Sequence, residues 1–461
     1  MSDELDIPSG WEKVKLDELI IRMTNGANVI QFDEKIGFPI SRIETIWNQG
    51  IDLSRVKYIK ESDPEFIEKY KLRDNDILFS HINSDSHIGK TAIFKIEKTC
   101  TIIHGINLLL LRPSKEISAA LLNYQFNYLR SKGSFAAVAQ KAVNQSSINQ
   151  AKLKQFDFFV PPLAEQHRIV TKLEELFSSL DKAIERITTA KQQLKVYRQA
   201  VLKYAFEGRF TNDNLKDGEM PKGWATVKLG SIFVETPQNG VYKPSTMYGT
   251  GVRIMRIDGF YDGNLLDTYQ YKRLQLSEEE IKKYKLEIND LLINRVNSMS
   301  YLGKCGLVKK LSEVTVFESN IMRTKLNLNL AKPKYISNYL SSKNGLEELR
   351  KNAKQAVNQA SINQTDVANV EVPLPLPPEQ ILIVEEIESR LSVCDKIEEG
   401  IENSLLKAEA LRQSILTKAF EGKLVPQDPS DEPARKLIER IRTEREKHEG
   451  AKVKKERKIK I

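Results

Sequence analysis

The chain carries one sequence pattern twice, and the second copy follows the first by about 214 residues. The run AVNQSSINQ at 142–150 returns as AVNQASINQ at 356–364. The run LRDNDIL at 72–78 returns as LEINDLL at 286–292, and AFEG at 205–208 returns unchanged at 419–422. Chance does not preserve one spacing through so many separate blocks. The chain is therefore an internal duplication, in which each copy is expected to fold as an equivalent module.

Each copy begins with about 160 residues whose pattern is typical of a mixed α/β domain. Short apolar runs at 77–79, 91–96 and 106–111 predict strands, and 119–129 predicts a helix. The segments 23–50 and 235–263 lack such a pattern and differ between the copies. We interpret these two segments as loops, which is where binding specificity usually resides on a rigid scaffold.

A long helix is predicted after each domain. Prolines at 161–162 and 377–378 favour a helix start, and Gly208 and Gly422 favour a helix end. Apolar residues between these marks step by three and four, which is the heptad pattern of a coiled coil. The predicted first seam is Leu173, Leu176, Leu180, Ala183, Ile187, Ala190, Leu194, Tyr197, Val201 and Tyr204. The looser second seam is Ile387, Leu391, Cys394, Ile397, Ile401, Leu405, Ala408, Leu411 and Ile415.

These seams predict that the two helices pair with each other in an antiparallel coiled coil, each about 60 Å long. The alternative is that each helix packs on its own domain. The predicted fold is α/β (α+β), with two globular domains, two long helices and an internal pseudo-twofold repeat. The predicted boundaries are 1–162 and 211–376 for the domains, 163–210 and 377–425 for the helices, and 426–461 for a basic C-terminal tail. Its basic run at 452–460 is expected to be solvated and mobile, with contact to DNA or a partner subunit as the alternative.

The charge of the chain permits a polyanionic partner but does not establish one. Lys and Arg number 71 against 62 Asp and Glu, a formal charge of +9. No apolar run is long enough for a membrane span, and the first residues do not resemble a signal peptide. The three cysteines are far apart in sequence, which is typical of reduced thiols in the cytoplasm.

Motifs for catalysis and metal binding are weak. Gly89-Lys90 resembles the end of a phosphate-binding loop, but Ser84 occupies the position where that motif requires glycine. We find no motif of an amino-methyltransferase or a nuclease. His81, His87, Cys100 and His104 suggest a metal site, but the second copy has Arg295 and Tyr301 at two of these places, so we expect none.

Polar and basic residues in the shared blocks and in the divergent segments could contact nucleic acid. His81 and its counterpart Arg295 can both donate hydrogen bonds to phosphate or guanine. The shared Asn-Gln blocks fit either phosphate anchoring or a structural join between domain and helix, and we favour the join slightly. The candidate DNA-binding residues are Arg42, His81, Asn83, Lys90, Lys141, Asn144, Gln145, Lys243, Arg253, Arg256, Arg295, Asn297, Lys304, Lys354, Asn358 and Gln359.

The assembled features resemble the specificity subunit of type I restriction–modification systems over nearly the whole chain. The resemblance rests on PPLAEQ at 161–166, on PPEQ at 377–380, on the openings around Trp11 and Trp224, and on the AFEG helix ends. The run PQDPSDEP at 426–433 also matches the family's tail. The resemblance implies a non-catalytic subunit whose two target recognition domains each read half of a bipartite, asymmetric DNA site.

The resemblance also implies what surrounds the chain. The expected partners are double-stranded DNA, two modification (methyltransferase) subunits and restriction (translocase and nuclease) subunits, with no membrane. S-adenosylmethionine, ATP and Mg are expected in those partners and not in this chain. The helices would set the unread spacer and dock the modification subunits. The residues expected for subunit docking or helix pairing are Leu173, Leu176, Leu180, Ile187, Leu194, Val201, Ile387, Leu391, Ile401, Leu405 and Ile415. The alternatives are a coiled-coil scaffold that binds no DNA and a remnant of a fused restriction or methylation enzyme.

Overall fold

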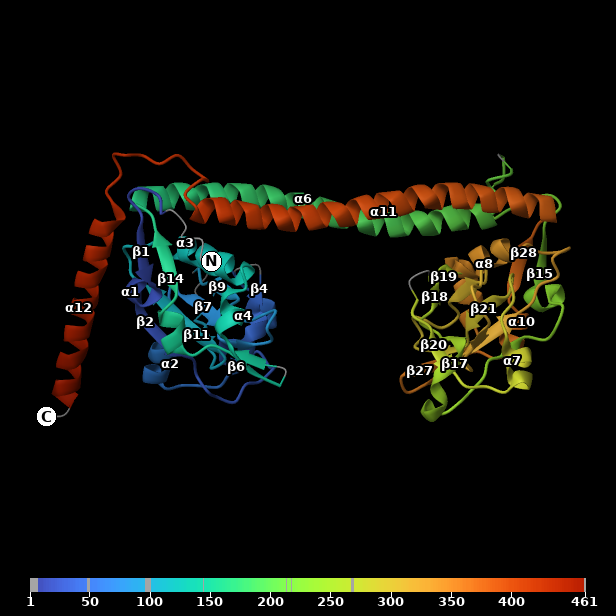
Figure 1. The fold of residues 1–461 in the computed structure, drawn as a ribbon, viewed down its shortest axis with the longest axis horizontal. Helices are drawn as coiled ribbons and strands as arrows, with labels where there is room; N and C mark the ends of the chain where they lie inside the picture. The colour runs from blue at the N-terminus through green and yellow to red at the C-terminus, as the bar shows by residue number, and fades with distance from the viewer. Residues whose placement is uncertain are drawn as a thin grey trace. The chain divides into compact units, whose positions relative to one another are not determined.

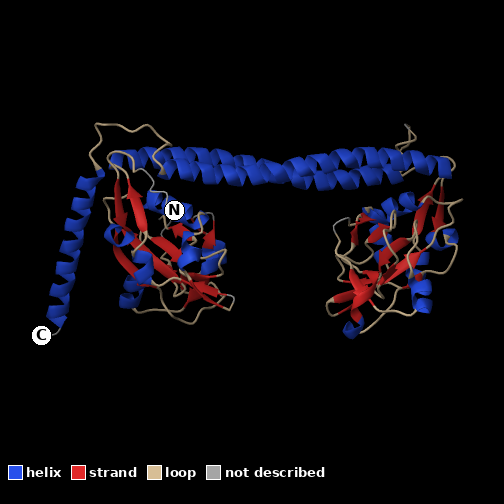
Figure 2. Cartoon of the chain, viewed as in Figure 1, coloured by secondary structure: helices blue, strands red, loops and turns tan. Residues whose placement is uncertain are grey.

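The computed structural model of the chain describes residues 7–47, 50–95, 101–143, 145–212, 214–216, 218–266 and 269–459, without the side chains of 447–459. It divides into two compact units, Met1–Arg186 with Ser404–Ile461, and Ile187–Asn403 (Figure 1). Each unit holds one globular domain and part of each long helix. Figure 2 shows that the strands gather in the two globular domains.

The first domain is built on an antiparallel sheet in the order β2-β11-β7-β9. Its strands are Ile20–Asn25, Leu108–Pro113, Ile77–Ser80 and Thr91–Ile93. Helix α3 (Ala119–Ser131) belongs to the same hydrophobic core, where its Leu122 and Phe126 join Phe79 of β7. The Ser118 hydroxyl accepts a hydrogen bond from the Leu121 N–H at 3.3 Å and so caps the helix.

The second domain repeats this sheet and extends it. Its strands run in the order β16-β25-β21-β23-β19-β18. The first four correspond to β2, β11, β7 and β9, and the last two have no counterpart in the first sheet. Their bounds are Gln238–Asn239, Ile321–Thr324, Leu291–Asn294, Cys305–Leu307, Gly263–Leu265 and Phe260–Tyr261. Helix α8 (Pro333–Ser341) contributes Ile336 and Leu340 to this core.

Smaller elements complete each domain. In the first domain they are β1 (Glu12–Lys15), α1 (Leu16–Leu19), β3 (Phe38–Ser41), β4 (Ile46–Trp47), β5 (Gly50–Ile51), β6 (Lys57–Ile59), α2 (Pro64–Tyr70), β8 (Ile82–Asn83), β10 (Ile103–His104), α4 (Ser134–Val138), β12 (Gln140–Ala142), β13 (Gln145–Ser147), α5 (Gln150–Lys154) and β14 (Asp157–Val160). In the second they are β15 (Ala225–Lys228), β17 (Tyr248–Met255), β20 (Lys272–Leu274), α7 (Glu278–Tyr284), β22 (Val296–Asn297), β24 (Thr315–Phe317), α9 (Lys343–Arg350), β26 (Lys354–Ala356), β27 (Gln359–Ser361), α10 (Gln364–Ala368) and β28 (Glu371–Leu374).

Most of the predicted elements are confirmed, with shifted ends. The helix expected at 119–129 is α3, and the strand expected at 77–79 is β7. The strand expected at 106–111 begins two residues later, at Leu108. The interpretation of 23–50 and 235–263 as loops is wrong in part, because the first contains β3 and the second contains the eight-residue strand β17. Strand β17 pairs with β20 on one side and β24 on the other, and this pairing stabilises it although its residues do not alternate clearly in polarity.

The two long helices begin where the prolines predict. Helix α6 spans Leu163–Phe206 and α11 spans Pro377–Phe420, and the glycines that follow both adopt positive φ, 76° at Gly208 and 68° at Gly422. Left-handed glycine is a common way to end a helix. In unit Ile187–Asn403, Lys191 pairs with Glu402 and Arg198 with Asp395, so residue numbers rise on α6 as they fall on α11. The predicted antiparallel pairing is confirmed.

The predicted seam of α6 is correct at every second position. Leu173, Leu180, Leu194 and Val201 are buried, and Ile187 is half-buried. Between them the inward positions fall one residue later than predicted. The residues that face inward are Phe177, Ile184, Lys191, Arg198 and Ala205, in place of Leu176, Ala183, Ala190, Tyr197 and Tyr204. Leu176 is half-buried and packs at the margin of the core around Phe177.

The predicted seam of α11 is correct except at two places. Ile387, Cys394, Ile401, Ala408 and Ile415 are buried, and Leu391 and Leu405 are half-buried. Ile397 and Leu411 are 47% and 50% exposed, and the next residues, Glu398 and Arg412, face inward instead. Both form ion pairs with α6, Glu398 with Arg198 and Arg412 with Asp181, so paired charges replace apolar contacts there.

The segment 426–461, predicted only as a basic tail, contains a helix in its described part, and the side chains of 452–460 lie outside the described ones. Residues Ala434–Ile459 form helix α12, whose Leu437, Ile438 and Ile441 lie in the core of the first domain beside α1. Arg442 pairs with Glu18 at 2.7 Å and Arg440 with Glu116 at 2.9 Å. The apolar spacing of three and four buries one face of α12. The first domain is therefore completed by the C-terminal end of the chain.

Candidate nucleic-acid interface

The shared blocks at 142–150 and 356–364 divide into two parts with different roles. In the second part, Asn149 and Asn363 cap helices α5 and α10, accepting hydrogen bonds from backbone N–H groups at 2.8 and 3.0 Å. The next residue ties the block to a divergent segment, since Gln150 donates to the Asn25 side chain at 2.8 Å and Gln364 donates to the Pro237 carbonyl. These contacts give this part a structural role within each domain, while the favoured join to the long helix stays a prediction.

The first part of each shared block is an exposed hairpin. Strands β12 and β13 pair antiparallel in the first domain, as do β26 and β27 in the second. A two-residue connection joins the strands, and its first residue is Val143 or Val357. Lys141, Gln145, Lys354, Asn358 and Gln359 are all exposed on these hairpins. Asn144 lies outside the described residues.

A third strand at the base of each hairpin carries an asparagine whose side chain forms hydrogen bonds within the domain. β8 pairs with β13, and β22 pairs with β27. The Asn83 amide donates to the Ser80 hydroxyl and accepts from the Ser84 N–H, and the Asn297 carbonyl oxygen accepts from the Ser298 N–H. These bonds limit the capacity of both asparagines for other contacts.

The counterparts His81 and Arg295 are not equally placed. Only 8% of His81 is exposed, and burial lowers its pKa to about 4, so the ring is neutral at pH 7. This burial argues against a contact between His81 and DNA. Arg295 is half-buried and donates to the Ser319 carbonyl at 3.1 Å.

The basic candidates in the second domain's divergent segment are held by carboxylates. Arg256 pairs with Glu318 at 3.1 Å, and Lys243 pairs with Glu280 at 2.7 Å. Arg253 on β17 pairs with Glu313, and its guanidinium lies 5.1 Å from the Tyr271 ring. Such pairs orient cations at a surface, and an oriented Arg can form bidentate contacts with guanine.

Lys90 and Lys304 have different surroundings despite their equivalent positions. Lys304 lies over two exposed or half-buried rings, 4.7 Å from Tyr261 and 4.5 Å from Tyr301. Lys90 instead lines a cleft of 1080 Å³ in the first unit, between the globular domain and its part of the helix pair. Burial lowers the pKa of Lys90, and the nearby Arg130 lowers it further. Lys90 is therefore not on the hairpin surface.

The sequence reasoning missed an aromatic–cation pair in the first domain. Trp47 is 53% exposed, and the Arg55 guanidinium lies 4.3 Å from its ring. The predicted candidate Arg42 is close by in sequence and pairs with Glu44 at 3.2 Å. Tyr271 with Arg253 forms the corresponding kind of pair in the second domain. Aromatic and basic residues alternate just after positions 50 and 263, where Arg55 and Tyr271 lie. This pattern could have identified both pairs from the sequence.

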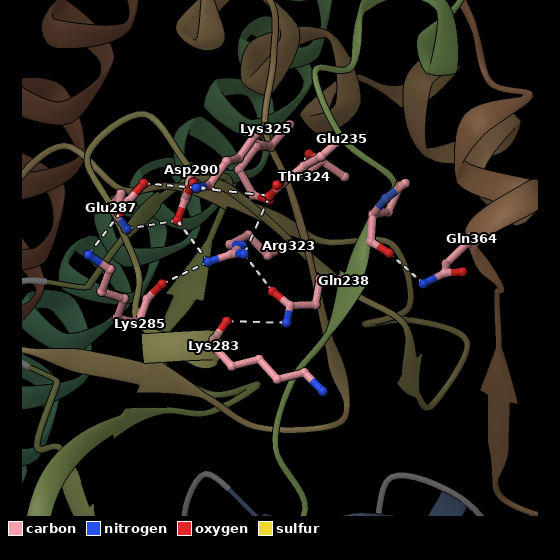
Figure 3. A network of polar contacts seen from close by, with 12 residues as sticks. Glu235, Gln238, Lys283, Lys285, Glu287, Asp290, Arg323, Thr324, Lys325 and Gln364 are labelled. Carbon is pink, nitrogen blue, oxygen red and sulfur yellow. Dashed lines mark hydrogen bonds and ion pairs between the residues drawn. The ribbon is translucent and has the colours of Figure 1, made fainter. Parts of the chain in front are cut away.

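A polar network in the second domain is centred on the buried Arg323 and Asp290 (Figure 3). Arg323 on β25 donates to the Lys285 carbonyl at 2.7 Å and to the Gln238 side chain. Asp290 lies 3.8 Å from Arg323, and burial raises its pKa to about 6, although a hydrogen bond from the Glu287 N–H opposes the increase. This network fixes the base of the divergent segment, because Glu235 and Gln238 both contact Arg323.

Other features of the described residues limit the chemistry. Among them, no three His, Cys, Asp or Glu side chains lie close enough to hold a metal ion. Cys305 and Cys394 are buried and free, and Cys100 lies outside the described ranges. Within the part of the chain that the structure covers, no helix combines the length and the apolar character needed to cross a membrane.

Comparison with known proteins identifies the repeated unit. The model of the type I restriction modification DNA specificity domain matches residues 8–195 and again residues 221–407. A putative type I restriction enzyme MjaX specificity subunit from Methanocaldococcus jannaschii is 31% identical over 91% of this chain and 95% of that protein. The type I restriction enzyme EcoKI specificity subunit of Escherichia coli is 29% identical over 90% of each chain.

Solved structures share the fold. A chain in a structure described as "Structural basis underlying complex assembly and conformational transition of the type I R-M system" superposes with a TM-score of 0.70 at 19% identity, covering 91% of this chain and 100% of that one. The crystal structure of the HsdS subunit from Thermoanaerobacter tengcongensis superposes with a TM-score of 0.51 at 18% identity, covering 92% and 99%.

Proposed function

The chain belongs to the family of type I restriction–modification DNA specificity proteins, and from this premise we propose that it is the DNA sequence-recognition subunit of a type I restriction–modification complex. The observation that carries the proposal is that the DNA specificity domain matches twice, once in each copy of the repeat. A specificity subunit is the non-catalytic component of such a system. The scaffold and fused-enzyme alternatives are not favoured.

Each globular domain is proposed to read one half of a bipartite site. The two domains share one sheet order, but their divergent segments carry different side chains. The Trp47–Arg55 pair has a counterpart in kind, not in position, in the Tyr271–Arg253 pair. Base contacts specify sequence whereas phosphate contacts position a protein. Two domains that share a sheet but differ in the segments proposed to contact bases therefore fit an asymmetric DNA site.

The helix pair is proposed to set the unread spacer and to dock two modification subunits. Several large apolar side chains of α6 and α11 point to solvent: Val196 is 71% exposed, Leu406 70% and Val393 55%. A partner subunit that covered these side chains would bury their apolar surface. Restriction subunits are proposed as further partners of the assembled complex.

We place the cofactors and the catalysis of the proposed complex outside this chain. S-adenosylmethionine belongs to the modification subunits, and ATP and Mg belong to the restriction subunits. Double-stranded DNA is the substrate of the complex, so its place is the cytoplasm.

Binding measurements on the complex test this function. The chain, purified with its modification subunits, is expected to retain one class of genomic duplex fragments over random fragments. Its affinity is expected to fall steeply with salt, because bound Lys and Arg release counterions from phosphates. A scaffold would show equal, weak retention of all fragments. That result would exclude sequence recognition by this chain.

A further inference from the structure

We propose that the two shared hairpins are wedges, whose tip valines, Val143 and Val357, insert into the base stack of the DNA duplex. This inference rests on the proposed function and adds a contact that acts alongside base reading. Each wedge would act in the half-site that its own domain reads. The valines would distort the duplex locally, while the divergent segments read the bases.

The exposure of the tips is the first argument. Val143 is 91% exposed and Val357 is 93% exposed, the two highest values among the large apolar residues with described side chains. At the second tip, Asn358 has a φ of 74°, while Val357 is not among the described residues with positive φ. Positive φ at the second central residue alone is the pattern of a type II turn. Val357 is thus the first central residue of the turn, where an exposed apolar side chain does not stabilise the fold.

The duplication is the second argument. The tip sequence Ala-Val-Asn-Gln is identical in both copies, although the segments proposed to read sequence diverge. The second parts of the same blocks have a structural reason to be shared, since Asn149 and Asn363 cap helices and Gln150 and Gln364 tie the block to the domain. The described residues of the two tips, by contrast, are all exposed. A role that both half-sites require accounts for their identity.

The chemistry around the tips selects the partner. Residues 139–147 and 353–361 contain lysine and several amides and no acidic side chain. Asp85, from the neighbouring turn, pairs with Lys141 at 3.0 Å, but Met299 occupies the corresponding position in the second copy. Lysine and amide side chains bind phosphates and base edges, and apolar wedges partly unstack base pairs in DNA-bending proteins. The lysine and amide side chains beside each tip, together with the tip valine, therefore suit duplex DNA as the partner.

The size of the tip argues against a protein partner. A stable protein interface buries about 800 Å² on each side. One valine on a two-residue turn cannot supply the apolar centre of such an interface. A single side chain, in contrast, is enough to separate two stacked base pairs.

The hairpins also lie next to the segments proposed to read sequence. The side chain of Asn294, which directly precedes Arg295 and β22, donates to the Ile257 carbonyl at 3.3 Å in the divergent segment. In Figure 1, β27, β17 and β20 all lie on the side of the second domain that faces away from α6 and α11. The proposal therefore places the tip and β17 on the same side of the domain as the duplex.

Fluorescence of 2-aminopurine tests the wedge. The probe is a duplex with the bipartite sequence obtained from the host's methylome, with 2-aminopurine at adenine positions other than the methylated one. The wild-type complex with its modification subunits is expected to raise the fluorescence in both half-sites. Val143→Ser is expected to abolish the increase in one half-site only, and Val357→Ser in the other only. Each variant is expected to bind about tenfold more weakly.

A matched valine elsewhere on the surface is the control for the two tips. Serine suits an exposed turn, so both tip variants are expected to fold. Val234→Ser removes another exposed valine, 59% exposed and outside the hairpins, and is expected to keep both signals. Unchanged signals in both tip variants would overturn the wedge while leaving sequence recognition intact. Loss of modification subunits from the tip variants, with unchanged fluorescence, would also overturn it and would assign the tips to a protein contact.

Discussion

At the scale of single residues, the two copies differ in how an arginine contacts an equivalent buried aspartate. Asp76 in the first domain is fully buried and forms two 2.7 Å hydrogen bonds with Arg112. Its counterpart Asp290 is equally buried but lies 3.8 Å from Arg323, which is bound mainly by the Lys285 carbonyl and Gln238. Burial therefore raises the pKa of Asp290 to about 6. The raised pKa of Asp290 predicts a pH response of the second domain.

The second domain is expected to gain stability as the pH falls through 6. The folded-state pKa of Asp290 is above its unfolded value of 3.8, so folding favours the protonated form, and the benefit is lost as the pH rises through 6. Between pH 7 and 4.5 the gain from this group is about 2 kcal/mol. Urea unfolding of the wild type and Asp290→Asn across this range measures it. Parallel pH profiles for the two proteins would contradict the prediction.

Asp76→Asn is the matched comparison. Removing the buried Asp76 carboxylate leaves the half-buried Arg112 without its partner, which is expected to cost about 3 kcal/mol of stability in the first domain. Hydrogen exchange of β7 and β11 would measure the loss. The same measurement on β21 and β25 is expected to stay at the wild-type value, and equal losses in both domains would be inconsistent with two separate cores.

The aromatic–cation pairs are expected to act on one half-site each. Arg55→Ala is expected to relax base preference in the first half-site and Arg253→Ala in the second, by about 1–3 kcal/mol for each base read. Competition binding with duplexes that carry single base changes measures this preference. A uniform loss of affinity for all duplexes would instead assign these arginines to phosphates.

At the scale of elements, the sequence predicted the long helices better than the side chains that join them. Proline and glycine placed the starts of α6 and α11 correctly and their ends within a few residues. The seam was misplaced at alternate positions because Tyr197 and Ala190 look apolar, while Arg198 and Lys191 do not. Arg198 and Lys191 can face inward since acidic residues of α11 pair with them, and no periodicity within one helix reveals that partner.

The pairing predicts how the spacer responds to helix length. One heptad inserted into both α6 and α11 preserves their antiparallel match and lengthens the pair by about 10 Å. The preferred spacer is expected to grow by about three base pairs, with both half-sites unchanged. Methylome sequencing of the variant measures it. An unchanged spacer would show that the helices do not set the distance.

Helix α12 predicts a dependence of the first domain on the end of the chain. Ile441 is fully buried in the first domain's core, so Ile441→Ala is expected to cost about 2–5 kcal/mol there. Faster hydrogen exchange in β2 and α3 would report it, while β25 and α8 are expected to remain protected. Arg435→Ala, on the exposed face of the same helix, is the control, and an equal effect of both changes would refute core packing by α12.

At the scale of the whole molecule, comparing the two copies distinguishes structural residues from candidate DNA-contacting residues only in part. The shared blocks proved to contain both, a structural end at Asn149 and Asn363 and exposed tips at Val143 and Val357. Sequence comparison could not divide them, because both ends are equally shared and only burial distinguishes them. Sequence comparison also did not predict that the polar residue His81 is buried or that Lys90 lines a cleft.

The central claim is that two different domains of one chain each read half of a DNA site. Single-molecule methylome sequencing of otherwise identical host strains, with and without this gene, tests it most directly. The expected result is one methylated motif made of two unlike half-sites separated by a fixed number of unread bases, absent from the strain without the gene. An unchanged methylome after deletion, or a dependent motif that is continuous and unsplit, would contradict the claim.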